Sequence, residues 1–155
     1  MTIRAAAFLS LTALLANAVA LVACRSSSGA YRSGAQPAAP TESTFAQQAE
    51  RGSRVYANAC ARCHGTLGRG TGRAPALVGP NALPGTPPAS RHMRTTTFAT
   101  AGDVQRFVVS SMPPRGPRPS DADAWAVVAF ALQANGITSP SPLSAANGDA
   151  VPLGR

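Results

Sequence analysis

The chain has 155 residues and a net charge of +8 at neutral pH, and all fourteen of its basic residues are arginine. Much of its 45% hydrophobic content is alanine, which buries little area, so the helices of one domain would form only a thin core. The positive charge favours acidic partners. Because no basic run carries interleaved aromatic residues, the composition argues against binding of nucleic acid.

An apolar stretch follows Arg4 and ends in Leu21-Val22-Ala23-Cys24. Such a stretch is typical of a secretory signal, and it is also long enough for a retained transmembrane anchor. Its last four residues resemble the lipobox of bacterial lipoproteins, in which the cysteine becomes the lipidated first residue. The resemblance implies a signal peptide over 1–23, lipidation of Cys24 and a location in the periplasm. The choice between the inner and the outer membrane stays open.

The next segment, residues 24–43, starts at the anchored Cys24 and is rich in Ser, Gly, Ala and Pro, which predicts a flexible tether. Residues 138–155 have a similar loose composition and predict a disordered tail. The compact domain is therefore expected over residues 44–137.

Three helices are predicted within that domain. The first covers 44–60, where Thr44 and Gln47 form a capping box and five residues share one face: Phe45, Ala49, Gly52, Tyr56 and Cys60. The second begins after Thr100, with Asp103 three positions on, and buries Val104, Phe107 and Val108. No strand pattern is evident, so the fold class is all-α.

The third helix begins after Ser120, with Asp123 at the third position, and stops at Asn135-Gly136. Its predicted buried side includes Val127, Phe130, Ala131 and Ala134. Residues 65–95, between the first two helices, are rich in Gly and Pro. So long a segment without regular structure is unusual in a self-sufficient core, and it makes sense if it wraps a group that is not protein.

The motif Cys60-Ala61-Arg62-Cys63-His64 carries the chemistry of the chain. Three interpretations are open: a zinc site, a redox dithiol and a covalent haem site. Zinc needs four ligands, and His92 alone does not complete a convincing set. A redox dithiol usually precedes its helix, whereas these cysteines follow one. The C-x-x-C-H spacing lets two thiols reach both vinyl groups of one haem c and places His64 as the proximal iron ligand.

Residues 45–137 resemble the class I monohaem cytochromes c of bacterial type. The resemblance rests on Gly52, Tyr56 and Cys60 at four-residue intervals, on Phe130 of the last helix, on "APAL" at 74–77 and on "SMPP" at 111–114. It implies three or four helices and long Gly/Pro-rich loops around one covalent haem, with Gly52 at a helix crossing.

The same resemblance implies roles for three further residues. The Pro75 carbonyl would accept the proximal imidazole N–H, Leu77 would pack on the haem face, and Met112 would be the sixth iron ligand. Met93 and His92 remain rival distal ligands. The stretch 85–98 departs from many relatives because it lacks a tryptophan.

Taken together, these features predict a membrane-tethered one-electron carrier rather than an enzyme, although the chain could also be the cytochrome subunit of an oxidoreductase complex. It would shuttle between a dehydrogenase or quinol-oxidising complex and an oxidase or reductase, and its partners would be redox proteins with acidic docking faces. One alternative is a haem-based sensor or peroxidase with a labile distal ligand. Another is a haem-less lipoprotein whose Cys60 and Cys63 form a thiol redox pair.

Overall fold

The computed structural model describes residues 42–86 and 94–154. Four α-helices lie in these ranges: α1 (Phe45–Ala59), α2 (Ala61–His64), α3 (Ala101–Ser111) and α4 (Asp121–Ala134). A short 3-10 helix, η1 (Gly148–Ala150), follows near the C-terminus. The described residues contain no β-strand beyond one isolated bridge between Thr100 and Pro152, which confirms the all-α prediction for them. None of their helices is both long and apolar enough to cross a membrane.

The predicted helix starts are present because polar side chains at each start accept a backbone N–H. Thr100 and Asp103 form a full capping box at α3, and Ser120 accepts the Asp123 N–H at α4. At α1, Thr44 accepts the Gln47 N–H at 3.2 Å, but the Gln47 side chain accepts from the backbone N–H of Ser43 instead of that of Thr44. The capping box predicted there is therefore only half formed.

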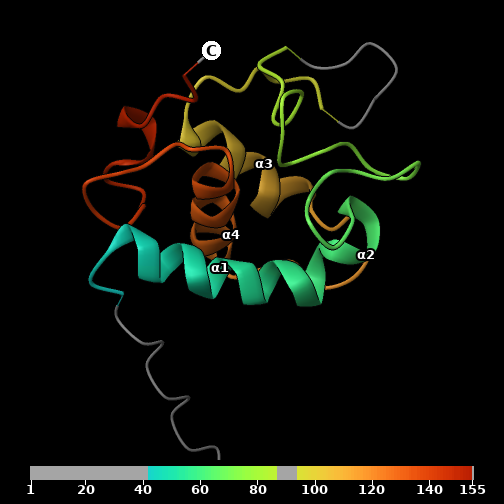
Figure 1. The fold of residues 1–155 in the computed structure, drawn as a ribbon, viewed down its shortest axis with the longest axis horizontal. Helices are drawn as coiled ribbons and strands as arrows, with labels where there is room; N and C mark the ends of the chain where they lie inside the picture. The colour runs from blue at the N-terminus through green and yellow to red at the C-terminus, as the bar shows by residue number, and fades with distance from the viewer. Residues whose placement is uncertain (1–41, 87–93, 155) are drawn as a thin grey trace, which may run out of the picture. The chain divides into compact units, whose positions relative to one another are not determined.

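Helices α1 and α4 cross at Gly52 (Figure 1). A Cβ atom at this position would lie 1.8 Å from the carbonyl oxygen of Ala126, so only glycine permits the approach. Beside the crossing, the rings of Tyr56 and Phe130 pack with centroids 5.0 Å apart. Helix α4 is buried on most sides, although Ala134, which was predicted to be buried, is exposed.

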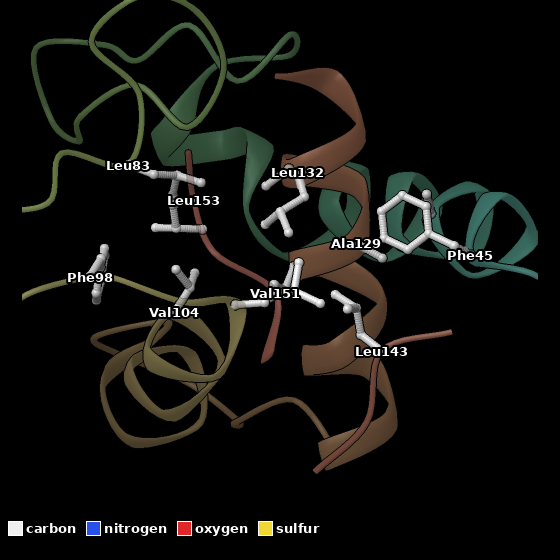
Figure 2. Close-up of a cluster of buried hydrophobic side chains, with 13 residues drawn as sticks. Phe45, Leu83, Phe98, Val104, Ala129, Leu132, Leu143, Val151 and Leu153 are labelled. Atoms are coloured by element: carbon white, nitrogen blue, oxygen red, sulfur yellow. The ribbon is translucent and has the colours of Figure 1, made fainter. Parts of the chain in front are cut away.

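The structure differs from the predicted disordered tail over residues 138–154. This segment folds back over α1, α3 and α4, and Figure 2 shows its Leu143, Val151 and Leu153 within the apolar cluster. The Gln48 side chain donates to the Leu143 carbonyl at 2.8 Å and accepts the Leu143 N–H at 2.6 Å. The composition, rich in Ser and Pro, suggested that conformational entropy would keep the tail loose. Burial of three apolar side chains and pairing of backbone groups offset that entropy.

Arg94 closes the loop that precedes α3. Its guanidinium is buried, donates to the carbonyls of Pro84, Gly85, Thr86 and Thr96, and lies 3.9 Å from the centroid of the Phe98 ring. Burial lowers the pKa of this arginine from its ordinary value. One cationic side chain thus joins both ends of the loop.

Candidate haem-binding site

The two cysteines of the motif lie at the junction of α1 and α2. Cys60 ends α1 and begins α2, and its carbonyl accepts the backbone N–H groups of Cys63 and His64, each at 3.0 Å. Residues three apart on such a turn are neighbours on one side, so both thiols can reach one planar group. Cys63 is exposed, Cys60 is half-buried, and both are free thiols.

His64 is buried at the end of α2, and its ring is held by the loop that follows. Its Nδ1 lies 2.8 Å from the carbonyl oxygen of Pro75, the contact that the resemblance implies. A carbonyl oxygen only accepts, so the proton is on Nδ1 and Nε2 keeps a lone pair for a metal. Such an outer contact also fixes the ring orientation of a metal-binding histidine.

Backbone hydrogen bonds hold the loop 65–79 beside this histidine. The Gly70 N–H donates to the His64 carbonyl at 2.9 Å, and the Gly68 carbonyl accepts the N–H of Leu77 at 2.7 Å. The loop carrying Pro75 is thereby fixed relative to the motif. Leu77 is half-buried and packs against the apolar cluster.

Two side chains that anchor this loop were missed as part of the site. The Asn135 side chain donates to the Leu77 carbonyl at 2.8 Å and accepts the Gly79 N–H at 3.0 Å, although the sequence indicated only a helix stop there. The Tyr56 hydroxyl donates to the Gly65 carbonyl, whereas the sequence placed Tyr56 only on the shared face of the first helix. Asn135 lies 56 and 58 positions from its two partners, so no local signal could reveal its contacts, and the Tyr56 contact forms nine positions away, beyond the end of α1.

The remaining predicted residues divide between described and undescribed parts of the chain. Met112 lies at the C-terminal end of α3 and is half-buried. The rival ligands His92 and Met93, and the predicted lipidation site Cys24, lie outside the described residues.

The two other interpretations of the motif gain little support. Within residues 42–86 and 94–154, no group of three or more His, Cys, Asp or Glu side chains could hold a metal ion. Burial, followed by the neighbouring Cys63, raises the pKa of the Cys60 thiol. Redox-active thiols have a lowered pKa, so the direction of this shift does not favour a catalytic dithiol. The donor set fits a haem: two free thiols three positions apart, followed by a histidine whose Nδ1 faces the Pro75 carbonyl.

Comparison with known proteins identifies the family of the chain. No curated protein matches the chain in sequence. A solved chain of the sulfane dehydrogenase SoxCD from Paracoccus pantotrophus is similar, with a TM-score of 0.51 and 28% identity over 68% of this protein. The match spans about half of that chain, 53% of its length. The family described as cytochrome C oxidase, cbb3-type, subunit III matches residues 47–130, from α1 to the middle of α4. Since this is more than half of the chain, the protein belongs to that family of cytochromes c.

Proposed function

We propose that this protein is a one-electron carrier that holds one haem c covalently and faces the periplasm from a lipid anchor. Cys60 and Cys63 would hold the haem through thioether bonds, and His64 and Met112 would bind its iron. The observation that carries the proposal is a contact of His64, the residue directly after Cys63. Its Nδ1 lies 2.8 Å from the carbonyl oxygen of Pro75.

The side chains of the site suit electron transfer better than catalysis. A haem bound here would supply one-electron chemistry at its iron. If His64 and Met112 both bind the iron, no position on it would remain for a substrate. The hydrogen bonds of the 65–79 loop keep His64 in one orientation, so gain and loss of an electron would require little movement.

The partners would be redox proteins on either side of the carrier. We propose a dehydrogenase or quinol-oxidising complex as donor and an oxidase or reductase as acceptor. Similarity to a chain of a sulfane dehydrogenase supports a dehydrogenase as one partner, and the family match supports an oxidase as another.

The haem and its ligands can be tested together on the full-length protein. We expect a reduced-minus-oxidised spectrum typical of haem c and a mass increase of one haem, both lost in Cys60→Ser/Cys63→Ser. Met112→Ala should retain the added mass but lose the far-red absorption of thioether–ferric ligation. A colourless wild-type protein from cells able to mature cytochromes c would contradict the proposal. An unchanged far-red band in Met112→Ala would assign the distal position to another residue.

The lipid anchor needs a separate test, because Cys24 lies outside the described residues. Each buried methylene of an acyl chain contributes ~0.8 kcal/mol to membrane binding, so acylated protein should sediment with membranes. Cys24→Ser should move it to the soluble fraction or leave it with an uncleaved signal, while its haem spectrum stays the same. Wild-type protein that is soluble without detergent would contradict the anchor and leave the haem assignment intact.

A further inference from the structure

Leu67 is 66% exposed, the one large hydrophobic side chain of residues 42–86 and 94–154 left in solvent. It follows His64 by three positions and lies in the loop that Pro75 and Gly68 tie to the motif. A single exposed leucine is common on protein surfaces, so its exposure by itself indicates nothing. Two further features distinguish Leu67: the hydrogen-bonded turn that carries it and the charged residues near it.

The turn that carries Leu67 is held at both ends. The Gly68 N–H donates to the Gly65 carbonyl at 3.0 Å, and the Tyr56 hydroxyl donates to the same carbonyl. The Gly68 carbonyl accepts the N–H groups of Leu77 and Val78 at 2.7 and 2.9 Å. Both glycines have positive φ, at 83° and 72°, which most other residues adopt only with strain. Leu67 is thus presented by an ordered backbone, so a partner would lose little entropy in fixing it.

The charges around the turn are of one sign. Residues 51–102 contain no Asp or Glu, and Arg62, Arg69 and Arg73 bracket Leu67 and are exposed. The acids of the described residues lie elsewhere, and five of them pair with Arg51, Arg54 or Arg106. The charged side chains nearest to Leu67 along the chain are therefore all arginines, and all three are exposed.

A shallow hollow adjoins this surface through Arg69. Its volume is about 330 Å³, and its lining is apolar except at Arg69 and Asn81: Arg69, Ala76, Val78, Gly79, Pro80 and Asn81. An acidic side chain from a partner could enter it and reach the guanidinium. An exposed apolar side chain beside a hollow that offers one guanidinium is the complement of an apolar recess with carboxylates at its rim.

We infer that Arg62, Leu67, Arg69 and Arg73, here called the Leu67 surface, are where the protein docks on a redox partner with an apolar recess rimmed by carboxylates. This deepens the proposed function and rests on it, since docking beside His64 brings the partner close to the haem. A lipid bilayer is the less suitable occupant. One leucine without aromatic neighbours offers too little apolar area for interfacial binding, even with the arginines.

The test measures binding of the haem-loaded full-length protein to a blue-copper protein with an acidic docking face, by calorimetry at low and high salt. Leu67→Ser should raise Kd about tenfold at both salt concentrations, since a buried apolar anchor is lost. Arg69→Gln should raise Kd about threefold at low salt and have little effect at high salt, because screening already weakens its contribution.

Arg54→Gln is the matched control, because it removes the same charge from an exposed pair with Glu50 on α1. It should leave Kd within a factor of about two of wild type, since rim charges outside the contact act only at long range. Three results would overturn the inference: wild type that does not bind the copper protein, equal Kd for Leu67→Ser and wild type, or equal losses for Arg54→Gln and Arg69→Gln. Leu67-dependent binding to phosphatidylglycerol vesicles alone would also overturn it, in favour of a lipid surface.

Failure of the docking surface and failure of the proposed function look different in this experiment. If only the docking inference is wrong, the protein still shows a haem c spectrum while Kd is insensitive to Leu67. If the proposed function is wrong, the preparation lacks that spectrum before any partner is added.

Discussion

Asp103 shows how one side chain stabilises both the start of a helix and the C-terminal segment. It accepts the backbone N–H groups of Ala99 and Thr100, each at 2.9 Å, and pairs with Arg106, which also contacts Asp149. The Ala99 N–H, followed by the Arg106 and Thr100 contacts, lowers the pKa of Asp103 from 3.8 to about 2. The ionised form is therefore the one that the fold favours.

The lowered pKa predicts the direction of a pH effect. The stabilisation is fully present above the unfolded pKa, near pH 4, and is lost as the pH falls through the folded value. In urea unfolding, the free energy of unfolding of wild type should fall between pH 5 and pH 2 by ~1–2 kcal/mol more than that of Asp103→Asn, after allowance for solvent screening. Asp121→Asn, at an exposed acid, is the control and should follow wild type. Parallel pH curves for wild type and Asp103→Asn would contradict this assignment.

Among the elements, the crossing of α1 and α4 depends on the missing side chain of Gly52. A methyl group there would overlap the backbone of Ala126, and backbone cannot rotate away as a side chain can. Because α1 ends at Cys60 and α4 ends at Asn135, whose side chain holds the Leu77 carbonyl, a shift at the crossing reaches both sides of the site.

We therefore expect Gly52→Ala to lower the free energy of unfolding by roughly 3 kcal/mol or more, as overpacking against rigid backbone does. Gly72→Ala is the matched control, because nothing lies within 4 Å of a Cβ at that position. It should change stability by less than ~0.5 kcal/mol. Chemical denaturation of the two holoproteins makes the comparison, and equal midpoints would show that the helices can separate without cost.

At the scale of the whole molecule, the C-terminal segment completes the core. Leu143, Val151 and Leu153 lie in one cluster with Leu132 and Val104 (Figure 2). Gly148 lies against the ring of Trp125 on α4, because a Cβ atom added at Gly148 would be only 2.2 Å from that ring. The C-terminal segment therefore approaches α4 closely at this point. The alanine-rich helices thus gain apolar area from residues that the sequence alone assigned to a loose tail.

Removing this contribution should weaken the entire domain. Leu143→Ala should lower the free energy of unfolding by ~2–5 kcal/mol, because Leu143 is only 2% exposed and its loss leaves a cavity. Leu67→Ala, the same substitution at a 66% exposed position, should cost less than ~0.5 kcal/mol. If Leu143→Ala unfolds at the same denaturant concentration as Leu67→Ala, the C-terminal segment does not contribute to the core in solution.

The sequence by itself determined the features that depend on nearby residues. The C-x-x-C-H spacing, the caps at Thr100 and Ser120, the stop at Asn135-Gly136 and the small residue at Gly52 are all local patterns with local physical causes. Only the tertiary structure decided how the Arg94 guanidinium, the Asn135 amide and the C-terminal segment are used. Gln48 and Leu143, for example, are 95 positions apart, and their hydrogen bonds form only because folding brings α1 and the C-terminal segment together. Such contacts depend on burial and on which backbone groups need partners, and neither is set until the chain has folded.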